Sequence, residues 1–158
     1  MFSKLLLLGG LAIIPLAAGD SVDAAWKSLQ SLDGEWQGMA GKTGITYTIV
    51  SGGSVVMERM HMAAPAPDMV TMYHRDGSGL VATHYCSLGN QPRMRAPEAD
   101  AKTIRFRFAD ITNLAKPGDA YMRDLTITFQ DKDHFTQEWT AVENGKDHVE
   151  TFQWTRKP

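Results

Sequence analysis

The chain has 158 residues and a nearly balanced charge, with 16 lysines and arginines against 18 aspartates and glutamates, for a formal net charge of −2 at pH 7. The basic residues are interspersed with acidic ones, so the charge pattern does not favour nucleic acid as a partner. A single cysteine, Cys86, excludes an internal disulfide.

Residues 1–19 have the pattern of a secretory signal peptide. Lys4 precedes an apolar run from Leu5 to Gly19, and the small residues Ala17 and Gly19 stand where a signal peptidase reads the chain. The run is shorter than the ~20 apolar residues that a membrane anchor needs. We therefore expect an exported protein, periplasmic or secreted, with no membrane span after cleavage. Its mature part, residues 20–158, is expected to form one domain.

The mature part begins with a predicted helix at 23–32, after which the sequence alternates. From Gly34 onward, apolar and polar residues exchange with a period of two, and turn signals separate the alternating runs, which is typical of antiparallel β structure. Residues 76–79 and 144–145 have the composition of tight hairpin turns. The predicted strands are 34–40, 44–50, 55–62, 69–75, 80–87, 92–96, 103–109, 123–130, 134–142 and 148–156.

Short turns join nearly all of these strands to their neighbours in sequence. An open sheet of this size would expose two edges, which invite aggregation, whereas closure removes both edges. The sequence therefore predicts an all-β fold, an up-and-down antiparallel β-barrel of about ten strands with a short N-terminal helix.

Two features at the ends of the predicted barrel carry a family resemblance. Gly34-Glu35-Trp36 opens the first strand directly after the helix, and Arg156 lies at the end of the last strand. This arrangement resembles the calycin superfamily, which includes lipocalins, fatty-acid-binding proteins and avidins. The resemblance implies that Gly34 and Trp36 pack at a closed base of the barrel and that Arg156 lies across the indole, a cation–π contact worth about 0.5–2 kcal/mol.

The stretches "MVTMYHRDGSGLVATHYC" and "GNQPRMR", residues 69–86 and 89–95, narrow this resemblance. They are similar to small exported bacterial proteins with a lipocalin-like or nitrobindin-like ten-stranded barrel, a group from which no established activity carries over. In nitrobindins a histidine near the C-terminal end ligates haem. The late histidines here, His134 and His148, lie in or beside predicted turns and match that pattern poorly.

A polar patch is predicted inside the barrel. Residues two apart on a strand point to the same face of the sheet. His84 and Cys86 therefore share a face with the two apolar residues that precede them at this spacing, which suits the barrel interior. Each of the two preceding strands offers a pair of polar residues, of which one member faces inward. The candidates for ligand contacts are His84, Cys86, Tyr73 or His74, and Glu58 or His61, with Asn90, Gln91 and Arg93 at the rim.

Apolar side chains are expected to surround this patch. Methionine fills irregular cavities and adapts to varied ligands, and five methionines occur between positions 57 and 72. The predicted apolar lining or core consists of Met57, Tyr73, Phe106, Phe129, Phe135 and Trp139.

Several uses of the patch stay open at this point. The first interpretation of the polar patch is a satisfied internal hydrogen-bond network. The second is the polar end of a pocket for a small apolar or amphipathic molecule. The third is a metal or haem site that uses His84 with Cys86 or a second histidine. A single His-x-Cys lacks the paired spacing of a zinc site. No oxyanion loop or glycine-rich elbow accompanies the thiol, so a thiol-dependent enzyme is disfavoured.

From these observations we expect an exported barrel, monomeric or weakly dimeric, that binds a small, largely apolar ligand in its interior. No catalytic residue, metal ligand or cofactor is assigned. The alternatives are a haem or metal protein, a thiol-dependent enzyme, and a ligand-free structural or interaction module.

Overall fold

The computed structural model of the chain describes residues 18–38, 41 and 43–158. Residues 1–17 of the predicted signal peptide lie outside the described residues. One helix, α1 (Ala18–Gln30), precedes ten strands and a single 3-10 turn, η1 (Ser51–Gly53). The strands are β1 (Gly34–Gly38), β2 (Gly44–Val50), β3 (Val55–His61), β4 (Met69–Asp76), β5 (Gly79–Tyr85), β6 (Gln91–Ala96), β7 (Thr103–Thr112), β8 (Tyr121–Phe129), β9 (His134–Glu143) and β10 (Lys146–Arg156).

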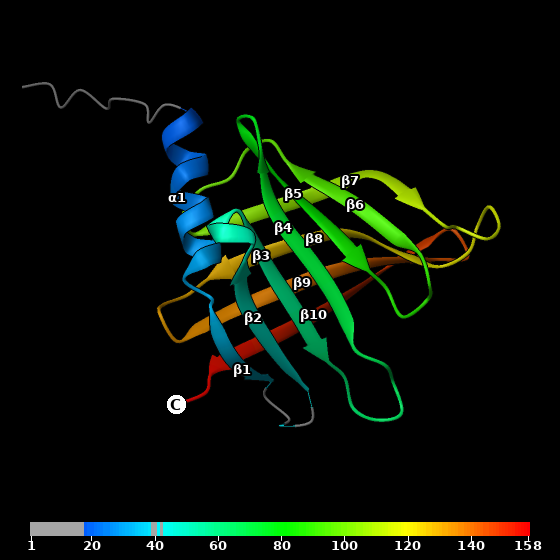
Figure 1. The fold of residues 1–158 in the computed structure, drawn as a ribbon. Coiled ribbons are helices and arrows are strands. Elements are labelled where there is room, and N and C mark those ends of the chain that lie inside the picture. The colour runs from blue at the N-terminus through cyan, green and yellow to red at the C-terminus, as the bar shows by residue number, and fades with distance from the viewer. Residues whose placement is uncertain (1–17, 39–40, 42) are drawn as a thin grey trace, which may run out of the picture.

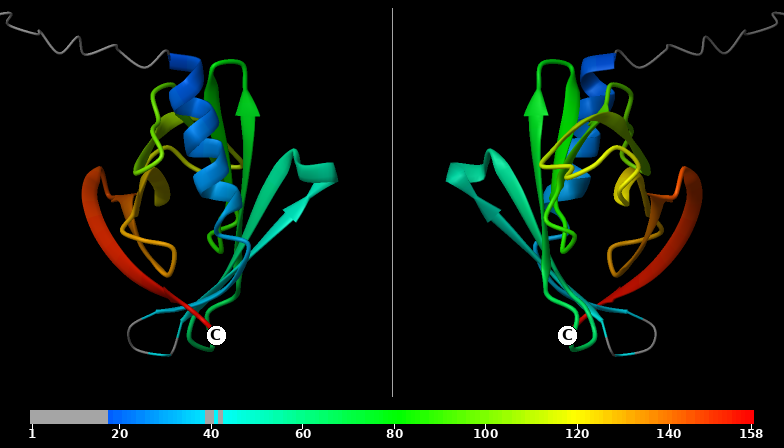
Figure 2. Two further views of the ribbon diagram at one scale, coloured as in Figure 1. Left: turned by 90° about the vertical axis from the view of Figure 1, so that its left-hand side faces the viewer. Right: turned by 90° about the vertical axis from the view of Figure 1, so that its right-hand side faces the viewer.

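The ten strands form a closed antiparallel barrel in which each strand pairs with its neighbours in sequence and β1 pairs with β10. The predicted fold class is therefore confirmed. Closure rests on a short ladder in which Trp36 stands opposite Arg156 and Gly38 opposite Trp154. The two side views show β10 and the β2–β3 pair converging where β1 joins them (Figure 2). The fold agrees with that of a calycin-like barrel.

The helix α1 lies across one end of this barrel (Figures 1 and 2). Its apolar residues Val22, Ala25 and Leu29 are buried and belong to the same core as the inward side chains of the strands. Polar contacts tie the helix to the turns at this end: Ser28 Oγ donates to the Ala101 carbonyl, and Asp23 pairs with Arg75. The helix thus closes one end, and the opposite end carries the loops β3–β4, β5–β6 and β7–β8. Within the described part of the chain, no helix has the length and apolar character needed to cross a membrane.

Arg156 and Trp36 seal the base beneath α1. The Arg156 guanidinium carbon lies 4.1 Å from the centre of the Trp36 ring. Its nitrogens also donate to the carbonyls of Ser31 at 2.6 Å and Asp33 at 2.9 Å, in the link between α1 and β1. Trp36 Nε1 donates to the Leu32 carbonyl in that link at 2.7 Å. One contact point therefore joins the helix, the first strand and the last strand.

Gly34 permits this close approach. Its φ of +120° is a conformation that L side chains rarely adopt, and a Cβ placed there would lie 3.3 Å from Arg156 Nη1. Glycine at this position therefore allows the backbone conformation at the start of β1 and leaves space for the Arg156 guanidinium.

Replacing Arg156 with methionine should keep the aliphatic stem and remove the guanidinium. We expect the free energy of unfolding to fall by about 2 kcal/mol, because a cation–π contact and partly exposed charged hydrogen bonds disappear together. Denaturant unfolding followed by tryptophan fluorescence measures the change, which corresponds to a melting temperature roughly 4–8 °C lower. Lys157→Met is the matched control, since Lys157 forms only an exposed pair with Glu35. Equal stabilities of the two variants would contradict the proposed contribution of the Arg156 guanidinium to the free energy of unfolding.

Candidate functional site

The barrel interior holds a buried carboxylate, Glu58 on β3, which is 1 % exposed. Its Oε2 accepts hydrogen bonds from the hydroxyls of Tyr47 and Tyr73 and from Gln137 Nε2, each at 2.7 Å. Gln137 Oε1 in turn accepts from Trp154 Nε1 at 3.2 Å, which fixes the orientation of the amide. Strands far apart in sequence thus meet at one oxygen.

Burial governs the electrostatics of this network. Desolvation raises the pKa of Glu58, and the hydrogen bonds from Tyr47, Tyr73 and Gln137 act in the opposite direction. Desolvation, followed by the nearby Glu58, raises the pKa of both tyrosines well above the usual value, so their hydroxyls remain protonated donors. The three hydrogen bonds thus offset part of the cost of burying this carboxyl group.

His84 lies on β5 and is 3 % exposed. Its Nδ1 is 2.9 Å from the Thr71 hydroxyl on β4, and its ring lies 4.8 Å from that of Trp139, centre to centre. Desolvation lowers the pKa of His84 to about 4, so the imidazole is neutral at physiological pH. Nε2, at the other side of the ring, is buried and has no hydrogen-bond partner among the described residues.

A cavity of about 90 Å³ opens beside His84, at the end of the barrel away from α1. Its wall is mostly apolar, with four methionines and two aromatic residues, and Glu150 is its one carboxylate. Typical pockets for drug-sized ligands occupy roughly 300–1,000 Å³, so this partly open cavity can enclose part of a small molecule, such as one edge of a benzene ring, and not a haem macrocycle. The lining residues are Met60, Met62, Met69, His84, Met122, Trp139, Glu150 and Phe152.

The structure brings together three of the residues that the sequence nominated for ligand contacts. Glu58, Tyr73 and His84 all point into the barrel, because they occupy inward positions on three neighbouring strands. Thr71 links two of them, since its hydroxyl reaches His84 and also interacts with Tyr73.

Other nominated residues lie elsewhere. His74 and His61 have the opposite parity from Tyr73 and Glu58 and stand on the outer face. Arg93 is also on the outer face, where it pairs with Asp110. Met57 alternates with inward residues and is likewise turned outward.

Cys86 is half-buried and lies after the end of β5. Its backbone turns to meet Gly89 and Asn90 instead of continuing the strand. The alternation that carries His84 inward therefore does not extend to the thiol, and Cys86 does not line the cavity. Among the described residues, no three His, Cys, Asp or Glu side chains gather as metal ligands.

Several residues of the site were not nominated from the sequence. Tyr47 lies on the same inward face of β2 as Ile45, and a buried tyrosine hydroxyl needs a hydrogen-bond partner inside the barrel. Gln137 stands between Phe135 and Trp139 on the inward face of β9, and a polar residue between two buried aromatics was the available signal. Met122 gave no such signal, because a register shift between Met122 and Asp124 breaks the alternation of β8.

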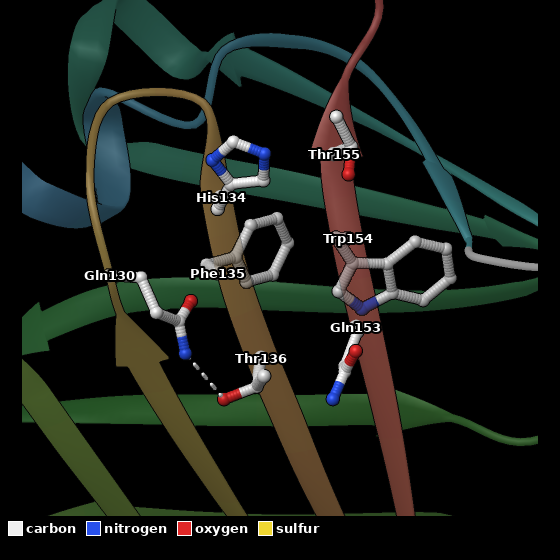
Figure 3. Close-up of a pocket in the computed structure, with 7 residues that line it drawn as sticks. All are labelled: Gln130, His134, Phe135, Thr136, Gln153, Trp154 and Thr155. Atoms are coloured by element: carbon white, nitrogen blue, oxygen red, sulfur yellow. Dashed lines mark hydrogen bonds between the residues drawn. The ribbon is translucent and has the colours of Figure 1, made fainter.

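A larger hollow of about 380 Å³ lies over β9 and β10 (Figure 3). The Gln130 amide donates to Thr136 Oγ1 there at 3.2 Å, and His134 pairs with Asp131. Only two of its seven lining residues, Phe135 and Trp154, are buried, and none of the seven carries a buried polar atom that lacks a partner. The smaller interior cavity is therefore the better candidate for a specific site.

Comparison of the sequence with protein-family models and with curated proteins finds no match. The geometry of the barrel interior is therefore the feature of this chain that bears on its function.

The depressed pKa of His84 has a measurable consequence for stability. Its folded-state value of about 4 lies below the unfolded value of about 6.5, so His84 contributes stability that is present above pH 6.5 and is lost as the pH falls toward 4. We expect the stability difference between the wild type and His84→Gln to be about 3 kcal/mol larger at pH 7 than at pH 4. Denaturant unfolding across this range measures it.

The matched control for that experiment is His148→Gln, at an exposed position on β10. Its stability difference from the wild type should change little over the same range. An NMR titration in which the His84 imidazole protonates near pH 6.5 would contradict the assignment of a desolvated ring.

Proposed function

We propose that the protein is an exported barrel that binds a small, largely apolar ligand in the cavity beside His84. The observation that carries this proposal is a cavity at one end of the barrel whose wall combines four methionines with a buried histidine and tryptophan. Unbranched thioether side chains adapt to ligands of different shape. Predominantly apolar walls with a few placed polar groups are the usual composition of ligand pockets.

The charges around the cavity disfavour an anionic ligand. His84 is uncharged at neutral pH, and Glu150 is the only carboxylate in the wall. An anion would meet no cation in the lining and would be repelled by Glu150. The walls therefore suit a molecule with an apolar body and no negative charge.

Binding is favoured over catalysis by the placement of the reactive groups. Cys86 lies outside the lining, and Glu58 already accepts three hydrogen bonds from protein groups. A general acid or base must reach the reacting atom within hydrogen-bond distance, and these two groups do not face the cavity. Thr71, which shares the inward face of β4 with Tyr73, bonds His84 beside this network.

The test of binding uses the methionines as reporters. We expect titration with toluene to shift the ¹³C-methyl resonances of Met60, Met62, Met69 and Met122, because an aromatic ring in the cavity lies against these side chains. The methyl resonances of Met57 and Met72, which lie on outer faces, should stay in place. Shifts spread equally over all methionines, or no shifts at all, would contradict the proposal.

A pair of variants checks the location. Met62→Trp fills part of the cavity and should weaken toluene binding by at least about tenfold, equivalent to about 1.4 kcal/mol. Met57→Trp places the same ring on the outer face of β3 and should leave the affinity unchanged.

Export is a separate part of the proposal and rests on the sequence of residues 1–19. The full chain, expressed in a Gram-negative bacterial host, should appear in the periplasm with Asp20 as its N-terminus, as read by N-terminal sequencing. Ala17→Tyr should leave the precursor uncleaved, since the peptidase requires a small residue there, whereas Ala18→Ser should be processed normally. A chain that remains cytoplasmic with an intact N-terminus would refute export without touching the binding proposal.

A further inference from the structure

Two unpaired polar groups converge on one cavity. The buried side-chain atoms without a hydrogen-bond partner among the described residues are His84 Nε2, Trp139 Nε1 and Asn90 Oδ1. The first two belong to residues that line the cavity beside β5 and β9, and these residues are 3 % and 2 % exposed. Leaving a buried polar group unpaired costs about 1–3 kcal/mol, so two such groups in one wall point to a ligand that satisfies both.

His84 Nε2 is a hydrogen-bonding group in either tautomer of the ring. His84 Nδ1 lies 2.9 Å from the Thr71 hydroxyl, and either atom can be the donor of this bond. A neutral imidazole carries one proton, on Nδ1 or on Nε2. Nε2 is accordingly an acceptor in the first tautomer and a donor in the second.

A hydroxyl group can both donate and accept a hydrogen bond. It therefore pairs with His84 Nε2 in either tautomer, whereas a ketone oxygen pairs only with a protonated Nε2.

Trp139 supplies a second group. Indole Nε1 is a donor only, and its ring lies 4.8 Å from the His84 ring, centre to centre. The cavity wall thus holds an imidazole nitrogen and an indole donor on neighbouring rings, surrounded by thioether and aromatic surface.

We infer that the cavity binds the hydroxyl group of a small, otherwise apolar alcohol or phenol, which pairs with His84 Nε2 and accepts from Trp139 Nε1. An ammonium group has no lone pair with which to accept, and a ketone has no proton to give to a bare Nε2. The inference rests on the proposed function and adds the chemical class of the ligand. Thr71 acts in it as a positioning residue, because its hydroxyl bonds Nδ1 on the other side of the His84 ring.

The experiment compares phenol with toluene, which has nearly the same shape and lacks the hydroxyl group. We expect phenol to bind at least about fivefold more tightly, the equivalent of one net hydrogen bond. Titration calorimetry gives the affinities, and the methionine methyl resonances report where each probe binds. In the unliganded protein, ¹⁵N chemical shifts identify the ring nitrogen of His84 that carries the proton.

Two variants separate the roles of the polar groups. Trp139→Phe removes the N–H and retains an aromatic ring, so the preference for phenol should fall to about twofold or less. Trp154→Phe is its matched control, since Trp154 Nε1 donates to Gln137 outside the cavity, and the preference should persist. Thr71→Val keeps the shape of the side chain and removes the hydroxyl that bonds His84 Nδ1. It should change the ¹⁵N shifts of the His84 ring and reduce the preference as well.

Each other outcome overturns the inference in a distinct way. If toluene binds at least as tightly as phenol, the cavity is a purely apolar site, and the proposed function stands without the hydroxyl group. If neither probe moves the four methionine methyls, both proposals fail. Tighter binding of benzoate than of phenol would show an anion site. Soft monovalent cations favour thioether and imidazole ligands, so stoichiometric Ag⁺ binding without a preference for phenol would assign the cavity to a metal ion.

Discussion

The pairing of the first strand with the last is the constraint on which the rest of this structure depends. The β1–β10 ladder is short, and side chains add to it at its base. There the Arg156 guanidinium lies on Trp36 and also binds carbonyls between α1 and β1. This contact fixes the helix across the same end that it closes. The barrel consequently has one sealed end, and its cavity lies at the other.

Closure also explains how the barrel tolerates a carboxylate in its interior. An isolated buried charge is costly unless it is paired or hydrogen-bonded, and Glu58 gains its donors from β2, β4 and β9. These strands face one another only because the sheet is closed. The network in turn links the strands across the interior, so that opening the barrel would strip the carboxylate of its partners and expose it to water at once.

The interior thus has a satisfied zone and an unsatisfied zone. Around Glu58, donors and acceptors match, and the groups serve to order the core. Around His84 and Trp139, two ring nitrogens face a small apolar cavity without protein partners among the described residues. Thr71 bonds the other side of the His84 ring through its hydroxyl. Placed polar groups beside an adaptable methionine wall are an arrangement suited to holding the polar end of a ligand while its apolar part varies.

The sequence determined the architecture. Alternation with a period of two, short turns and the positions of Trp36 and Arg156 were sufficient to predict ten antiparallel strands closed into a barrel, because strand periodicity is a local property of the chain. The sequence also indicated His84 as an inward residue. On each of the two preceding strands it left two candidates for the inward polar residue. Within such a pair the inward member cannot be read locally, since a shift of one residue exchanges the two faces of a strand.

Tertiary structure alone decided between those neighbours and assembled the site. Tyr73 and Glu58 face inward and His74 and His61 outward because of the register that closure imposes. Cys86 leaves the row because β5 ends at Tyr85. The partnership of Glu58 with Gln137 spans 79 positions in the chain, and no local pattern encodes which distant side chains will meet. The cavity depends in the same way on side chains from six strands and their ends, since its shape is the space that their packing leaves.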